Sequence, residues 1–146
     1  MASKDRLSSR WSSGEAKDVL RRHAFQADPA DPRVARGFLG SLRPYGGLIE
    51  ENFHEVMEAL IALAPELSDG RRVDREVMSA LWGICHFARS WGVHPEGMLR
   101  RNELIAPHDV ERLEEWVETI SYAVTSLLDG GPVEEAFADY HPHEAS

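Results

Sequence analysis

Glu51 and His54 form a Glu-x-x-His pair, the first pattern in the chain that could bind a metal. A spacing of three residues places both side chains on one side of a helix, as in helical di-iron proteins. Such sites need a second pair and further carboxylates, and the sequence has no second Glu-x-x-His. Glu51 also lies opposite the apolar stripe of its helix. We therefore favour a solvated helix face and predict neither a metal site nor a cofactor.

A second candidate site surrounds His86, at the polar edge of an apolar helical pattern. His86 lies near Gly83 and one turn after Trp82, so a small pocket could form over the glycine. With Tyr45 and His54, these residues define an alternative hypothesis: a helical enzyme, or a small-ligand or metal-binding protein, with a site near His86 and His54. A partly buried histidine bonded to a neighbouring carbonyl or carboxylate is the more common arrangement.

Motifs for nucleophilic catalysis or phosphate binding are missing from the sequence. It has no Gly-x-Ser-x-Gly, no phosphate-binding loop and no dinucleotide fingerprint. Cys85, the single cysteine, falls in an apolar arc where a thiol packs as a small hydrophobic group. We predict no catalytic residue and expect a binding protein rather than an enzyme.

The strongest functional pattern is acidic. Glu111, Glu114, Glu115 and Glu118 share one side of a long amphipathic segment, and Tyr122 lies among them. An aromatic residue surrounded by charge is typical of an interface hot spot. We predict that these five residues bind a protein partner.

The distribution of charge favours a basic partner. Residues 1–47 carry a formal net charge of +4 and residues 48–146 carry −13, which together give −9. Such a surface repels nucleic-acid phosphates. An inhibitor or immunity-type protein that captures a basic toxin or nuclease would fit by analogy. Four tryptophans, with Trp11 in a polar leader, keep a homodimer open as a further hypothesis.

The length of 146 residues suits one domain with a packed core. The first residues are polar and do not resemble a signal peptide, and no run approaches the roughly 20 apolar residues that cross a bilayer. We expect a cytoplasmic protein that does not associate with membranes.

Hydrophobic periodicity predicts an all-α fold: a small single-domain bundle of about five to six helices around a central helix at 74–91. Asp74 is a suitable N-cap for that helix, and Gly92 is expected to end it in the left-handed conformation. The apolar arc covers more than half of its circumference, which predicts neighbours on at least two sides. No stretch alternates with period two, so we predict no sheet.

The other elements follow from caps and breakers. A capping box of Ser12 and Glu15 predicts a helix over 13–26. Further helices are predicted at 32–42, at 48–64 with Pro65 as its stop, near 95–102, and from Pro107 to Gly130. The expected organisation is a flexible leader at 1–12, a helical domain at 13–130 and an acidic tail at 131–146. Four residues of the tail could dock as a short segment: Val133, Ala136, Phe137 and Tyr140.

Overall fold

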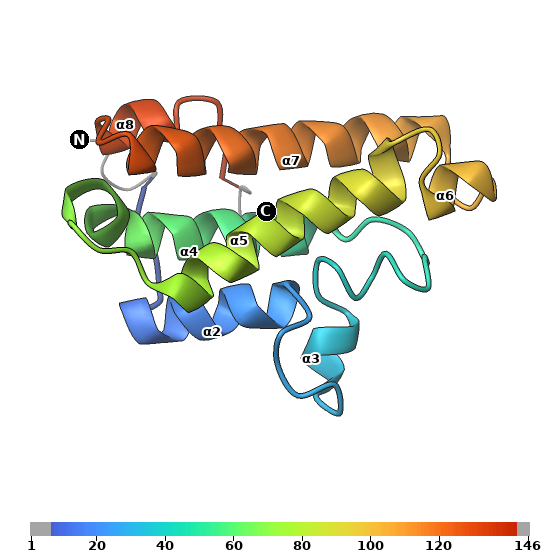
Figure 1. The fold of residues 1–146 in the computed structure, drawn as a ribbon, viewed down its shortest axis with the longest axis horizontal. Helices are drawn as coiled ribbons and strands as arrows, with labels where there is room; N and C mark the ends of the chain where they lie inside the picture. The colour runs from blue at the N-terminus through green and yellow to red at the C-terminus, as the bar shows by residue number, and fades with distance from the viewer. Residues whose placement is uncertain (1–6, 143–146) are drawn as a thin grey trace.

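The computed structural model describes residues 7–142, and these form an all-α bundle (Figure 1). Within this range there is no β-strand, only an isolated bridge between Leu42 and Tyr45. No helix in the described part of the chain is both long and apolar enough to span a membrane. The elements are α2 (Ser13–His23), α3 (Pro32–Ala35), α4 (Glu50–Asp69), α5 (Arg75–Ala88), the π-helix η1 (Arg89–Val93), α6 (Met98–Arg101), α7 (Pro107–Leu128) and α8 (Val133–Ala136).

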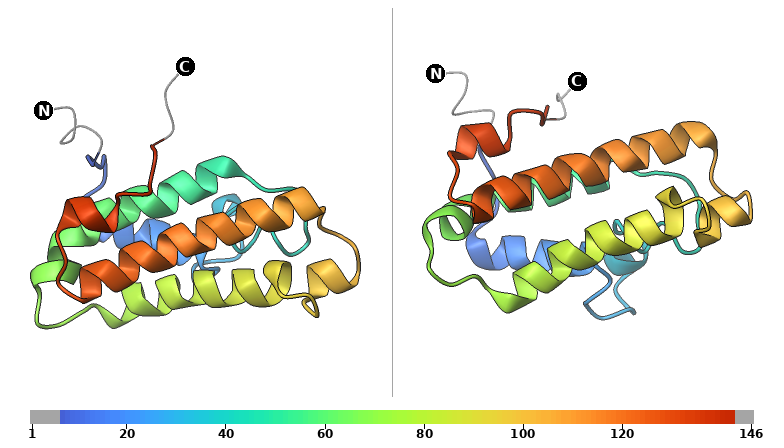
Figure 2. Two further views of the ribbon diagram at one scale, coloured as in Figure 1. Left: turned by 90° about the horizontal axis from the view of Figure 1, so that it is seen from above. Right: turned by 45° about the horizontal axis from the view of Figure 1, so that its top comes forward.

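Four helices build the bundle. α2 packs against α4 and α5, and α7 packs against the same two helices on the other side. Each long helix therefore has two long neighbours, and the core lies between them (Figure 2). The predicted bundle is confirmed, but α5 occupies one corner of it, and α4 contributes the largest set of buried side chains.

The helix predicted at 74–91 forms as α5 and continues into η1. The Asp74 carboxylate accepts the Glu76 backbone N–H at 2.8 Å, which confirms the predicted cap. α2 and α7 cover two sides of its apolar arc. The outward side stays open, because Trp82 is 74% exposed and Phe87 is 41% exposed. The predicted neighbours on two sides are confirmed, and these two residues of the arc lie outside both contacts.

The prediction that Gly92 ends this helix in the left-handed conformation is wrong. Gly92 is buried inside η1, and a Cβ atom at this position would lie 2.5 Å from Leu113 Cδ2 of α7. The glycine instead lets the π-helical turn approach α7 closely.

The helix predicted at 32–42 ends at Ala35, and the chain then folds into turns. Gly40 permits this path, since a Cβ atom there would lie 2.3 Å from the Val34 carbonyl oxygen. The apolar residues that suggested a longer helix are still buried: Phe38, Leu39 and Leu42. Burial was therefore predictable here, although the helix was not.

Pro65 does not end α4, which is a second wrong boundary. The helix continues to Asp69, with Pro65 on its exposed side. Leu67 is only 5% exposed and packs into the core. Packing of the last turn outweighs the backbone hydrogen bond that proline cannot make.

Local signals place the remaining boundaries closely. The Ser12–Glu15 capping box is present, and α2 begins at Ser13, although it ends at His23 rather than residue 26. α7 begins at Pro107 and Gly130 follows its end with φ +81°. α6 begins at Met98, later than predicted, with Gly97 as N-cap.

Both ends of the described range, residues 7–142, contact the bundle. Trp11 is partly buried against the core, with the Arg10 guanidinium 4.5 Å from its ring centre. The tail segment that could dock does so: α8 packs on α7, and Phe137 and Tyr140 are buried. Residues 1–6 of the predicted leader and 143–146 of the predicted tail lie outside the described residues.

Candidate functional site

The outer face of α7 carries the five predicted partner-binding residues. Its opposite side is packed into the core by Leu113, Val117 and Ile120, all fully buried, which fixes the orientation of the helix. The five outward residues, which we call the α7 acidic face, are all exposed: Glu111, Glu114, Glu115, Glu118 and Tyr122. Tyr122 is 47% exposed, so its ring is available for contact.

The charge of the α7 acidic face is largely uncompensated within the molecule. Glu118 accepts a hydrogen bond from Arg89 of η1 at 2.9 Å, and both side chains are exposed. The other three glutamates have no ion-pair partner among residues 7–142. Arg112, the only lysine or arginine between residues 107 and 142, pairs instead with Glu50 at 2.7 Å and stacks over Trp116.

His54 does not lie on a solvated face, and that expectation is wrong. Its ring is buried, with Nδ1 2.8 Å from the Tyr140 hydroxyl and Nε2 3.2 Å from the Glu50 carboxylate. The hydrogen bond from His54 lowers the pKa of Glu50, and burial raises the pKa of Tyr140. Glu51 turns elsewhere, toward Arg10 at 4.0 Å. The Glu-x-x-His residues therefore have separate partners.

A second histidine, His23, is also buried, and the sequence did not predict its hydrogen bonds. Phe38 donates its backbone N–H to His23 Nδ1 at 2.9 Å, so Nδ1 carries no proton. Nε2 then carries the proton and donates to the Glu55 carboxylate at 2.8 Å, which lowers the pKa of Glu55. The only signal in the sequence is that His23 falls on the apolar side of its helix, next to Val19 and Leu20.

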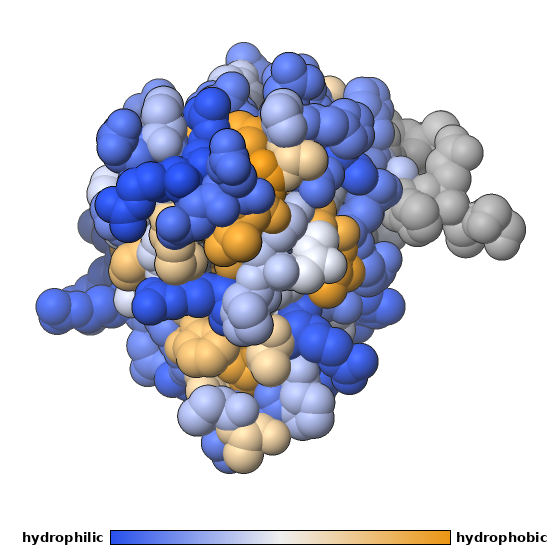
Figure 3. Space-filling view, turned by 90° about the vertical axis from the view of Figure 1, so that its right-hand side faces the viewer, coloured by the Kyte–Doolittle hydropathy of each residue, from blue (hydrophilic) through white to orange (hydrophobic). Residues whose placement is uncertain are grey.

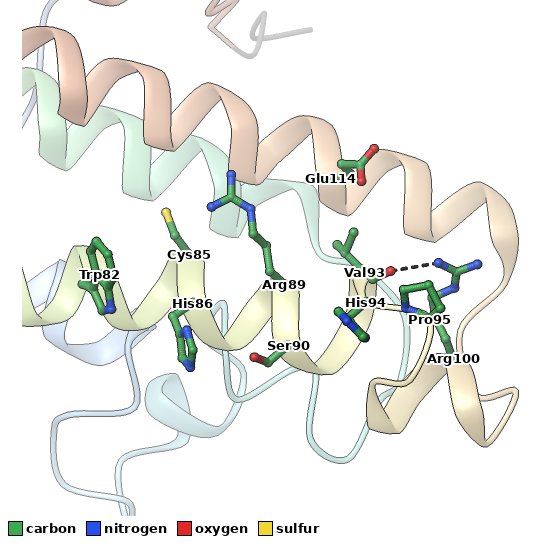
Figure 4. Close-up of a pocket in the computed structure, with 10 residues that line it drawn as sticks. All are labelled: Trp82, Cys85, His86, Arg89, Ser90, Val93, His94, Pro95, Arg100 and Glu114. Carbon is green, nitrogen blue, oxygen red and sulfur yellow. Dashed lines mark hydrogen bonds between the residues drawn. The ribbon is translucent and has the colours of Figure 1, made fainter.

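The four residues of the alternative ligand site do not meet at one place. His86 and Trp82 line a cavity of about 570 Å³ along α5 and η1 (Figure 4). His54 lines a different cavity of about 460 Å³ beside α7 and the C-terminal segment. Tyr45 lines neither of these two, and its hydroxyl donates to Asp109 at 2.7 Å. A site that combines His86 with His54 is not formed.

The sequence also left a pocket over Gly83 possible, but Gln26 lies against this glycine. Gly83 is buried, and a Cβ atom there would lie 3.6 Å from Gln26 Nε2, which bonds to Ser79. Cys85 lines the cavity beside His86, but it is partly buried and burial raises the pKa of its thiol. A raised pKa disfavours the reactive thiolate.

No group of three or more histidine, cysteine, aspartate or glutamate side chains within residues 7–142 is placed to hold a metal ion. At the end of the bundle that carries α6 and the start of α7, apolar surface lies in separate patches among hydrophilic side chains (Figure 3). This end therefore presents no continuous apolar face.

No protein-family model matches this chain, and no curated protein or solved structure is significantly similar to it.

Proposed function

We propose that this protein is a helical binding module, and that the α7 acidic face captures a protein partner with a basic surface. The observation that carries the proposal is the exposed ring of Tyr122 beside glutamates, three of which lack an ion-pair partner among the described residues. Aromatic anchors surrounded by polar groups are common at interface hot spots.

The charge supports fast association with such a partner. Between residues 107 and 142 there are nine carboxylates and one arginine. α8 adds two further exposed carboxylates, Glu134 and Glu135. A surface of one sign raises association rates with an oppositely charged protein by about 10- to 1000-fold at low salt. The same field repels nucleic-acid phosphates.

The rigidity of α7 supports a specific interface. The helix is anchored by an apolar stripe of six buried residues: Leu113, Trp116, Val117, Ile120, Ala123 and Leu127. A preformed face loses little conformational entropy when it binds. An inhibitor or immunity-type role, in which a basic nuclease or toxin is neutralised, would use such a face, and it is proposed by analogy with charge-steered inhibitors.

The test compares two variants with the same change of net charge. Glu111→Lys/Glu115→Lys reverses two unpaired carboxylates of the α7 acidic face, whereas Asp18→Lys/Glu96→Lys reverses two exposed carboxylates on α2 and before α6. Each protein is immobilised and used to capture partners from native lysate, and the recovered basic protein is then titrated in purified form. We expect affinity to fall at least tenfold for the first variant and to stay near that of the unmodified protein for the second.

Tyr122→Ala provides a second, charge-neutral readout. Removal of a hot-spot aromatic should weaken binding about 30-fold, mainly through faster dissociation. Circular dichroism of each variant should match the unmodified protein, because all substituted residues are exposed. Equal affinity for both charge-reversed variants, together with no loss for Tyr122→Ala, would reject the α7 acidic face as the binding surface.

A further inference from the structure

A cavity of about 460 Å³ lies between α4, α7 and the segment that follows α8. After α8 the chain turns back toward the start of α7 (Figure 2). Tyr140 fixes this segment, because its side chain is 4% exposed and its hydroxyl lies 2.8 Å from His54 Nδ1 of α4. Its two neighbours in the chain, Asp139 and His141, line the cavity. The returning chain therefore forms one side of a space that the two helices leave open.

The inner wall of the cavity is apolar. Phe53 of α4 and Trp116 of α7 line it, each 8% exposed, and their rings are stacked with centroids 5.5 Å apart. Pro142 adds apolar surface from the C-terminal segment. An apolar wall with charged groups beside it suits a long cationic side chain, whose stem is aliphatic and whose end is charged.

The chain's own Arg112 shows that this wall accepts a guanidinium group. Its Cζ lies 5.2 Å from the Trp116 ring centre, and its Nη2 pairs with Glu50 at 2.7 Å. Both charged residues line the cavity. Because Phe53 and Arg112 already cover the Trp116 ring, a ligand has to use the remainder of the space.

Two carboxylates of the lining are not paired within the described part of the molecule. Glu115 of α7 and Asp139 are exposed and have no ion-pair partner among residues 7–142. The charges of Glu50 and Arg112 offset each other. With histidine counted as neutral, the cavity therefore keeps the negative charge of Glu115 and Asp139, which favours a cation.

We propose that this cavity receives one lysine or arginine side chain of the basic partner. The aliphatic stem packs beside Phe53 and Pro142, and the cationic end lies where Glu115 and Asp139 supply negative charge. Glu115 also belongs to the α7 acidic face, so the cavity adjoins the surface on which Tyr122 lies. The inference rests on the proposed function and adds to it a position for one particular kind of partner side chain.

The first test uses two pairs of blocked tripeptides that differ only in charge at the middle residue. One pair compares arginine with citrulline, and the other compares lysine with acetyl-lysine. Each peptide is titrated into the full chain at matched ionic strength and followed by NMR. We expect at least one cationic peptide to bind with a Kd of about 10 mM or tighter, and its neutral counterpart to bind at least about threefold more weakly. The pair with the larger difference identifies the preferred cation.

The signals that move should locate the peptide. The Trp116 indole N–H and the backbone amides of Thr119 and Asp139 should shift, because these residues line the cavity. The Trp82 indole N–H should not shift, since Trp82 lines the other cavity. Asp139→Asn should weaken the cationic peptide about threefold. Asp129→Asn is the matched control, because Asp129 is exposed and does not line the cavity.

The same two variants test the cavity with the purified partner. Asp139→Asn should lower affinity about three- to tenfold, whereas Asp129→Asn should leave it unchanged. Both variants should keep the unmodified circular dichroism spectrum, because both residues are exposed. Tyr122→Ala separates the two proposals. If it weakens partner binding and Asp139→Asn does not, the α7 acidic face stands and the cavity is not part of the interface. The reverse result would keep the cavity and reject the α7 acidic face.

Two results with the peptides alone would also overturn the inference. The first is no change at the cavity signals with either cationic peptide at about 30 mM. The second is equal binding of the charged and neutral members of both pairs, or equal loss in Asp139→Asn and Asp129→Asn. Neither result depends on the partner, so the cavity can fail while the α7 acidic face stands.

Discussion

The polar sides of α4 and α7 look alike in the sequence but differ in the folded molecule. Both combine carboxylates and a histidine opposite an apolar stripe. On α4, His54 is bonded to Tyr140 of the C-terminal segment and Glu55 to His23 of α2. On α7, only Glu118 of the acidic face has an ion-pair partner within residues 7–142. A polar helix side is therefore a free surface only where no other segment covers it.

This difference divides the two helices by role. The polar contacts of α4 join three parts of the chain and are at least partly buried, so they stabilise the fold. The carboxylates of the α7 acidic face are solvated and contribute little to stability, which leaves them available for a partner. Substitutions on the two helices should separate these effects.

The largest effect is expected for His23→Ala. The change removes the acceptor of the buried Phe38 N–H and the partner of Glu55, and it leaves a void at a residue that is 2% exposed. We expect the free energy of unfolding in urea to fall by about 2–4 kcal/mol. Glu115→Ala on α7 is the comparison and should change it by less than about 0.5 kcal/mol. If His23→Ala lowered the free energy of unfolding by less than about 1 kcal/mol, the polar contacts of α4 would not stabilise the fold as described.

Glu55→Gln should alter the pH dependence of stability. The hydrogen bond from His23 lowers the pKa of Glu55 below its ordinary value of 4.5, so the unfolded chain binds a proton more readily than the folded one. This contribution is present above pH 4.5 and is lost as the pH falls through the lowered pKa. We expect Glu55→Gln to lower the free energy of unfolding by about 1 kcal/mol at neutral pH. Urea unfolding across a pH series should show the difference shrinking in acid, and a constant difference would be evidence against this pair.

Tyr140→Phe and Tyr122→Phe each remove one hydroxyl group. Tyr140 contacts the polar side of α4, whereas Tyr122 lies on the α7 acidic face. Tyr140 is 4% exposed and its hydroxyl bonds to His54, whereas Tyr122 is 47% exposed. Loss of the buried hydrogen bond should reduce stability by about 1 kcal/mol, or about 2–4 °C in Tm. Tyr122→Phe should leave Tm unchanged. Equal shifts for the two variants in thermal unfolding would show that the C-terminal segment does not hold α4 as described.

Glu118→Gln is expected to have the smallest effect. It removes the exposed ion pair with Arg89, and such pairs contribute less than about 1 kcal/mol. We expect a change below about 0.5 kcal/mol in urea unfolding, and a smaller one at high salt. A larger loss would mean that the α7 acidic face has a structural role that its exposure does not indicate.

Helix starts were the part of the fold that sequence patterns predicted best. Ser12, Asp74 and Pro107 act on backbone groups within their own first turn, so their effect does not depend on the rest of the chain. Helix ends were less predictable. Pro65 and Gly92 are both helix breakers by local preference, yet both lie inside helices because packing against the core decides there.

In the candidate sites, too, local patterns predicted some features and packing between distant segments decided the others. Helical periodicity correctly placed the five residues of the α7 acidic face on the exposed side. It could not show that Arg89, from another helix, pairs with only one of them. It drew attention to Trp82 and His86, but Arg100 and Glu114 join their cavity from elements separated in sequence. No local pattern connects these residues.

By itself, the sequence determined which segments become helices and which sides are apolar, because caps and hydrophobic periodicity act over one or two turns. The tertiary structure decided which polar sides are covered and which stay open. His54 is buried because Tyr140, 86 residues later, packs back onto α4, whereas no described segment covers Glu111 or Glu115 in that way. Contacts between distant segments depend on how the helices pack together, and periodicity along one helix carries no information about them.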